Sequence, residues 1–65
     1  MEREKADRFV RAVLKLYQRE GQFLISCPED TDEDCNQVRL SFESLGCTVS
    51  NVYIGGRLAF DVSCP

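Results

Sequence analysis

The apolar positions of residues 4–20 recur at the spacing of an amphipathic helix. At about 100° per residue, apolar side chains share one broad face and basic side chains occupy the opposite one. The apolar face is predicted to consist of Ala6, Phe9, Val10, Val13, Leu16 and Tyr17. Gly21 follows as the expected end of the helix, because glycine readily adopts the positive φ found after a helix C-terminus.

Residues 22–27 change to a short pattern that is rich in β-forming side chains. One side of this segment is predicted to carry Phe23, Ile25 and Cys27, and the other side Leu24 and Ser26. Because both sides hold apolar groups, we expect a largely buried strand. Pro28 closes the strand, since proline cannot donate a hydrogen bond to a ladder.

A second helical pattern begins with Thr31 or Asp32 as its N-cap and runs to about residue 45. Apolar side chains at intervals of three and four predict one stripe that faces the core. This stripe comprises Cys35, Val38, Phe42 and Leu45. Acidic residues near the cap favour the positive end of the helix dipole, and Gly46 supplies the expected stop.

Residues 47–64 predict a β-hairpin around Gly55-Gly56. Two glycines between alternating apolar segments are typical of a two-residue type I′ or II′ turn. With the turn fixed there, Ile54 faces Arg57 and, counting outward, Cys47 faces Cys64. The last strand is expected to alternate, with its apolar side made of Leu58, Phe60, Val62 and Cys64.

The predicted fold is therefore α+β, with the order α-β-α-β-β in a single domain of residues 1–65. We expect one three-stranded sheet, including the C-terminal hairpin, with two helices packed on one face. A chain of 65 residues buries only about 60% of its unfolded surface. Its stability is therefore marginal, and cross-links or association would matter. We expect a monomer or a weak homodimer.

The four cysteines leave two states open. Cys47 and Cys64 should occupy a non-hydrogen-bonded pair with Cα atoms ~4.5 Å apart, which a disulfide can bridge. The alternative is reduced thiols that act as small hydrophobes. The chain begins without the apolar segment of a secretory signal, and we expect a cytoplasmic protein, where thiols usually stay reduced. Cys27 and Cys35 are expected to be core thiols, with a reactive thiol at Cys35 as the alternative.

The charges are sorted along the chain. Six of the eight Lys and Arg residues lie in the first twenty positions, and five carboxylates crowd into the six residues 29–34. The first group forms a basic ridge on the first helix: Lys5, Arg8, Arg11, Lys15 and Arg19. The second group forms an acidic hexad: Glu29, Asp30, Asp32, Glu33 and Asp34, with Thr31 among them. Each group has two interpretations, an ordinary solvated or helix-capping segment and a surface that binds a partner.

Several function classes can be set aside. The hexad opens like a calcium-binding loop, but Cys35 and Ser41 stand where that loop requires glycine and glutamate. The chain has no histidine, no nucleophile beside a base, and no cysteine spacing typical of zinc. No apolar run of about 18 residues exists to span a membrane. We therefore expect no enzyme, metal or cofactor.

The charge sorting favours a small acidic protein-binding module. We expect it to inhibit or modulate a larger protein, one that handles nucleic acid, by imitating nucleic-acid charge as phage-type inhibitors do. The alternative is an accessory protein that binds nucleic acid or phosphate through the basic ridge. The net charge of −3 argues against that alternative, since nucleic-acid binders usually carry a basic excess.

The order of elements from Gly21 onward resembles the second half of the small sulfur-carrier proteins of the TusA family, in which a Leu-Gly pair like Leu45-Gly46 also ends a helix. Their signature is Cys-Pro-x-Pro at the start of a helix, with the cysteine carrying a persulfide. The nearest segment here begins Cys27-Pro28, but it lacks the second proline and precedes a different helix. The resemblance implies a further alternative, thiol or sulfur-carrier chemistry at Cys27.

Overall fold

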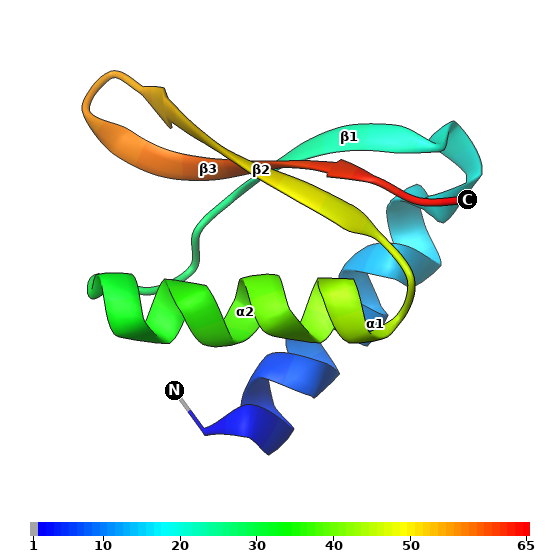
Figure 1. The fold of residues 1–65 in the computed structure, drawn as a ribbon, viewed down its shortest axis with the longest axis horizontal. Helices are drawn as coiled ribbons and strands as arrows, with labels where there is room; N and C mark the ends of the chain where they lie inside the picture. The colour runs from blue at the N-terminus through cyan, green and yellow to red at the C-terminus, as the bar shows by residue number, and fades with distance from the viewer. Residues whose placement is uncertain (1) are drawn as a thin grey trace.

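The computed structural model describes residues 2–65 and has the predicted α-β-α-β-β order. The elements are α1 (Arg3–Tyr17), the 3-10 turn η1 (Gln18–Glu20), β1 (Gln22–Ser26), α2 (Asp32–Ser44), β2 (Thr48–Ile54) and β3 (Arg57–Ser63). Both helices lie on the same side of the sheet (Figure 1). The predicted α+β fold is confirmed. Within the described chain, neither helix has the length and apolarity needed to cross a bilayer.

The sheet is antiparallel with the strand order β1-β3-β2, so the last strand is central. The hairpin pairs Ile54 with Arg57 beside the turn and keeps that register to the far ends of both strands, as predicted. Gly55 and Gly56 have φ angles of 59° and 79°. Two consecutive positive φ angles define the type I′ turn, whose twist matches that of the flanking strands.

The hydrophobic core lies between the inner face of the sheet and the two helices. Its largest fully buried side chains are Phe42, Phe60, Val10, Val38 and Val62. The end of α1 reaches β1 through Tyr17 and Phe23, whose rings stack with centroids 5.6 Å apart. Phe23 also meets Phe42 of α2 edge-on at 6.2 Å. Aromatic contacts of this kind stabilise a fold beyond the effect of the buried area alone, and here they link α1, β1 and α2.

Two predicted core positions are wrong because the buried stripes are narrower and shorter than the sequence pattern. Leu16 is 73% exposed, since it lies about 90° around α1 from the centre of the buried stripe, beyond the arc that α2 and the sheet cover. Leu45 is 48% exposed. It is the C-cap residue of α2 with ψ of 10°, so the chain leaves the helix there and the stripe ends one turn earlier, at Phe42.

The expectation that β1 is buried on both faces is also wrong. Phe23 is buried on the inner face, whereas Leu24 on the outer face is 57% exposed. The reason is architectural, because both helices cover the inner face (Figure 1) and no described element covers the outer one. The outer face instead holds polar contacts, such as the hydrogen bond that Gln22 Nε2 donates to Asp61 Oδ1 at 3.0 Å.

A polar contact that the sequence pattern did not predict joins the two helices. The hydroxyl of Ser41, a buried residue on α2, donates a hydrogen bond of 2.6 Å to Oδ1 of Asp7 on α1. A buried hydroxyl without a partner would destabilise the fold. The contact therefore gives the Ser41 hydroxyl a partner where α1 packs against α2, beside the apolar stripe of α2.

Candidate functional site

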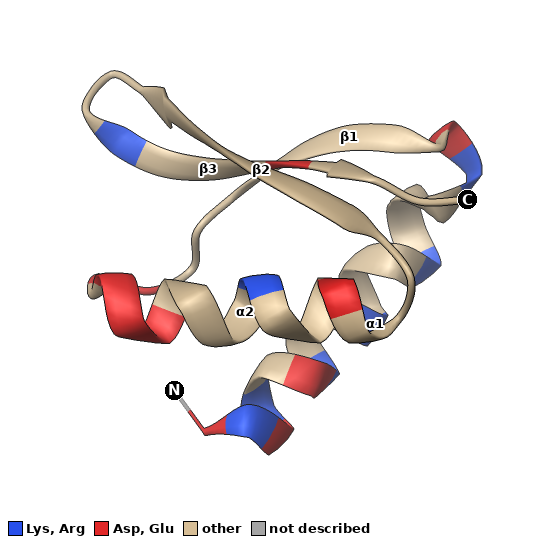
Figure 2. Ribbon diagram, in the orientation of Figure 1, with Lys and Arg blue, Asp and Glu red and all other residues tan. Residues whose placement is uncertain are grey.

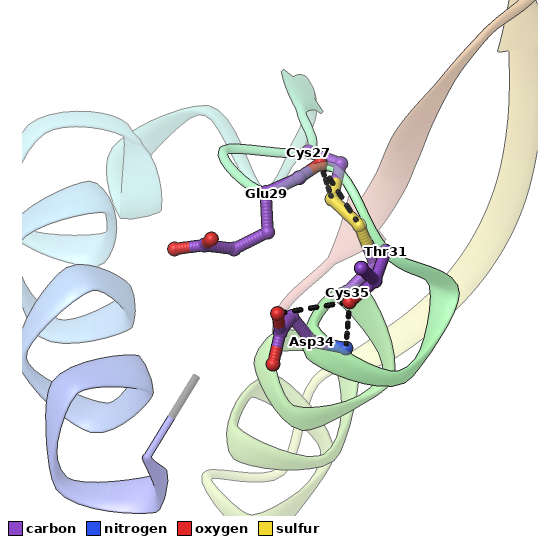
Figure 3. The surroundings of a disulfide bond; sticks show 5 residues. All are labelled: Cys27, Glu29, Thr31, Asp34 and Cys35. Carbon is purple, nitrogen blue, oxygen red and sulfur yellow. Dashed lines mark hydrogen bonds between the residues drawn. A yellow bond between two sulfur atoms is a disulfide. The ribbon is translucent and has the colours of Figure 1, made fainter.

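The segment between β1 and α2 is closed into a ring by a disulfide. Cys27, just after β1, is bonded to Cys35 in α2, with a Cα–Cα distance of 6.0 Å (Figure 3). This differs from the expectation of two separate core thiols. The pairing depends on how the acidic hexad turns the chain back toward β1, which periodicity does not reveal.

A second disulfide joins Cys47 to Cys64 at the open end of the hairpin. Their Cα atoms are 4.4 Å apart, the separation that follows from a non-hydrogen-bonded pair in the predicted register. The two residues are only 7% and 8% exposed. Both residues of this disulfide therefore belong to the core, whereas the Cys27–Cys35 disulfide has one core residue, Cys35, and one partly buried residue, Cys27, and lies beside the acidic hexad.

The hexad divides into a capping part and an outward part. Thr31 is the N-cap of α2: its Oγ1 accepts a hydrogen bond from the Asp34 backbone N–H at 3.2 Å and donates one to Asp34 Oδ2 at 2.8 Å (Figure 3). The Thr31 hydroxyl thus satisfies one backbone N–H at the start of the helix, and the Asp34 carboxylate accepts a hydrogen bond from that hydroxyl. Asp30, Asp32 and Glu33 are exposed, and their role in the fold is limited to the favourable position of Asp32 and Glu33 in the first turn of α2, at the positive end of the helix dipole.

The tip of the hairpin extends over the start of α2 (Figure 1). Residues of the hairpin and of the start of α2 together line a cleft. It consists of two adjoining hollows of about 400 and 370 Å³ that share Asp32, Cys35, Tyr53 and Leu58. We call it the α2–hairpin cleft. The first hollow continues to the core residue Phe60, and the second contains Cys27. The cleft is thus polar at its rim and apolar at its floor.

The rim of this cleft is predominantly acidic. Four carboxylates line it, from Glu29, Asp30, Asp32 and Glu33. Two basic residues, Arg39 and Arg57, also line the cleft. Nε of Arg39 lies 3.7 Å from Oε1 of Glu43 in an i,i+4 ion pair on α2. Figure 2 shows acidic residues gathered at the start of α2 and a basic segment on β3 near the hairpin tip. Four negative charges against two positive ones leave the cleft attractive to cations.

The basic ridge does not join this site. Its five side chains are exposed on α1 and η1, and neither hollow of the cleft is lined by a residue of those elements. Figure 2 shows basic residues distributed along α1 with acidic ones among them. The ridge is therefore a separate surface with mixed charge.

Sequence reasoning identified the acidic residues of the site but missed Tyr53 and Leu58. These two residues face each other in the hairpin register, next to the turn and on the side of the sheet that faces α2. An aromatic residue and a leucine paired beside a solvent-exposed turn are the signal that could have placed them in the site. Tyr53 is 67% exposed, so its ring is available to a partner.

Among residues 2–65, no group of three or more cysteine, aspartate or glutamate side chains is arranged to hold a metal ion. No protein-family model, curated protein or solved structure matches the chain. The site is therefore interpreted from its own geometry.

Proposed function

We propose that the protein is a non-enzymatic binding module whose α2–hairpin cleft receives a basic segment on the surface of a larger protein. The observation that supports this function is the joint presence of a concave surface, an exposed aromatic ring and an acidic rim. Tyr53 and Leu58 offer apolar contact area at the cleft, and Asp30, Asp32 and Glu33 offer unengaged hexad carboxylates beside it.

The two kinds of group would contribute differently to binding. Exposed ion pairs contribute about 0–1 kcal/mol each, so the carboxylates would mainly orient the partner and speed its association. Burial of an aromatic side chain at the centre of an interface can contribute about 2 kcal/mol or more. Most of the affinity is therefore assigned to Tyr53, and selectivity for a basic partner to the rim.

A basic surface of this kind is typical of proteins that bind nucleic acid, because phosphate contacts dominate such binding. A module that occupies it would exclude the nucleic acid, which makes inhibition or modulation of such a protein the proposed role. The cytoplasmic location expected from the sequence stays a prediction. The two disulfides would be unusual there, because disulfides persist chiefly in oxidising compartments.

The test is a fluorescence-anisotropy titration at low salt. The probes are a labelled peptide of arginines and leucines, its glutamate counterpart, and a labelled single-stranded oligonucleotide. We expect the basic peptide to bind and the other two not to bind. The triple variant Asp30→Asn/Asp32→Asn/Glu33→Gln should weaken binding roughly tenfold, the equivalent of about 1.4 kcal/mol, and should flatten its salt dependence.

The matched control is Glu2→Gln/Glu4→Gln/Glu20→Gln, which also removes three negative charges, but from exposed positions outside the cleft. Its affinity should stay close to that of the unaltered protein. Equal losses in both triple variants would show that net charge, not the cleft, attracts the peptide. Preferential binding of the oligonucleotide would instead favour the basic ridge as the functional surface.

A further inference from the structure

The two disulfides differ in their access to dissolved molecules. Cys47 and Cys64 are both more than nine-tenths buried and line neither hollow of the cleft. Cys27, by contrast, is only half-buried, and it lines the second hollow together with Cys35. A small thiol reagent can therefore reach the Cys27–Cys35 bond from the cleft, while the core covers the Cys47–Cys64 bond.

Within the accessible disulfide the two sulfur atoms are not equivalent. Cys35 is 3% exposed and lies in α2. Its backbone N–H donates a hydrogen bond of 3.0 Å to the carbonyl oxygen of Thr31. Cys27 is the more exposed partner and lies at the end of an edge strand. An attacking thiolate must approach the disulfide along an open path to one sulfur, and that sulfur is the Sγ of Cys27.

We propose that Cys27–Cys35 is a thiol–disulfide exchange site that prefers a positively charged thiol as its reactant. In the first step the reagent thiolate attacks Sγ of Cys27, and the Cys27–Cys35 bond breaks. The electron pair of that bond leaves on Sγ of Cys35, which takes a proton from water, and a mixed disulfide remains on Cys27.

In the second step another reagent thiolate attacks the reagent sulfur of the mixed disulfide. The Cys27 thiolate leaves and takes a proton from water. The protein disulfide has then gained two electrons and two protons, and two reagent thiols have become one reagent disulfide. The co-reactant is thus a monothiol in excess, or a dithiol that supplies both sulfurs.

The structure already provides an acceptor for the reduced state. The backbone carbonyl oxygen of Glu29 lies 3.4 Å from Sγ of Cys27 and 3.5 Å from Sγ of Cys35 (Figure 3). Bonded sulfurs carry no hydrogen, so these contacts are not hydrogen bonds while the disulfide is intact. After reduction each thiol could donate to this oxygen, which has two lone pairs. The ring can therefore open without leaving either thiol unpartnered.

The preference for a cationic thiol follows from the lining of the second hollow. Glu29, Asp30 and Asp32 contribute three negative charges there, and Arg57 contributes one positive charge. The resulting field concentrates cations and repels anions over a Debye length of about 8 Å at physiological salt. The attacking thiolate of cysteamine carries an ammonium group and has no net charge, whereas the thiolate of glutathione has a net negative charge. Cysteamine should therefore react faster than glutathione after correction for their thiolate concentrations.

The experiment treats the full oxidised chain with each thiol, quenches with iodoacetamide and maps the cysteines by mass spectrometry. We expect Cys27–Cys35 to open while Cys47–Cys64 stays intact, with the mixed disulfide on Cys27. The ratio of the cysteamine rate to the glutathione rate should show a gain of about tenfold at Cys27–Cys35 over the same ratio for a small acyclic disulfide. This gain should shrink in Asp30→Asn/Asp32→Asn and persist in the control Glu2→Gln/Glu4→Gln.

Opening of both disulfides at equal rates, a mixed disulfide on Cys35, or an unchanged rate ratio in the Asp30/Asp32 variant would each overturn the proposal. The reaction needs no protein partner. Its failure would leave the proposed binding function standing, and a failure of peptide binding would leave the exchange site standing.

Discussion

At the scale of single residues, the acidic hexad serves two purposes that its composition alone does not separate. Thr31 and Asp34 exchange hydrogen bonds at the N-cap of α2. Asp30, Asp32 and Glu33 are exposed, and they form part of the cleft rim. The local contacts therefore separate the carboxylate that supports the N-cap, Asp34, from the exposed carboxylates at the cleft.

Thr31→Ala should lower the free energy of unfolding by about 1 kcal/mol, because the first turn of α2 loses its side-chain acceptor. Thr31→Ser keeps the hydroxyl and should stay near the unaltered value. Urea denaturation followed by circular dichroism measures both. A Thr31→Ala protein as stable as the Thr31→Ser protein would show that the cap contributes nothing to the fold.

Several residue positions could not be predicted because their environment depends on distant elements. Leu16 and Leu24 are apolar at helix and strand spacing, yet both are exposed, since no element within residues 2–65 covers their side of the molecule. The Ser41–Asp7 hydrogen bond joins residues 34 positions apart, and nothing local in the sequence relates them. Periodicity reveals which residues can be buried, whereas the packing of α1, α2 and the sheet decides which ones are.

At the scale of elements, the hairpin was the most predictable part of the chain and the sheet order the least. Gly55-Gly56 favours a tight two-residue turn, and that turn sets every pair between β2 and β3. The position of β1 beside β3, rather than beside β2, has no such local cause. It follows from long-range packing, in which Phe23 of β1 meets the rings of Tyr17 and Phe42.

The turn itself can be tested with one tolerated and one costly substitution. Both glycines have positive φ, and a Cβ atom at either position would meet no atom within 4 Å, so backbone conformation alone decides the effect. Gly55→Asn should keep the stability, because Asn-Gly suits a type I′ turn. Gly56→Ala should cost about 1–2 kcal/mol, the penalty of a left-handed backbone for other residues. Thermal unfolding compares them, and equal melting temperatures would contradict the assigned turn.

At the scale of the whole molecule, the candidate site exists because two segments far apart in the sequence meet. The hexad could be recognised from its charges, but the cleft needs the hairpin tip to lie over the start of α2 (Figure 1). Tyr53 and Leu58 reach the site only through that arrangement. The open end of the hairpin is held by Cys47–Cys64, while Cys27–Cys35 closes the loop at the cleft. One cross-link therefore lies in the core and the other at the cleft.

This difference predicts different consequences for the loss of each disulfide. Cys47→Ala/Cys64→Ala removes a cross-link between residues 17 positions apart, which contributes about 3 kcal/mol by the loop-entropy estimate, and it also leaves a gap in the core. A single core in so small a chain rarely supplies more than about 3–5 kcal/mol. We therefore expect this variant to be largely unfolded near body temperature.

Cys27→Ala/Cys35→Ala removes a cross-link between residues only eight positions apart. The same estimate gives a loss somewhat below 3 kcal/mol, and only one of the two residues, Cys35, is buried in the core, whereas Cys47 and Cys64 both are. We expect this variant to remain folded, with faster amide hydrogen exchange confined to residues 28–34 and the first turn of α2. Hydrogen exchange with mass spectrometry on both variants distinguishes the two cases. Local exchange in the Cys47/Cys64 variant together with global unfolding of the Cys27/Cys35 variant would show that the disulfide at the cleft, not the one at the open end of the hairpin, holds the core together.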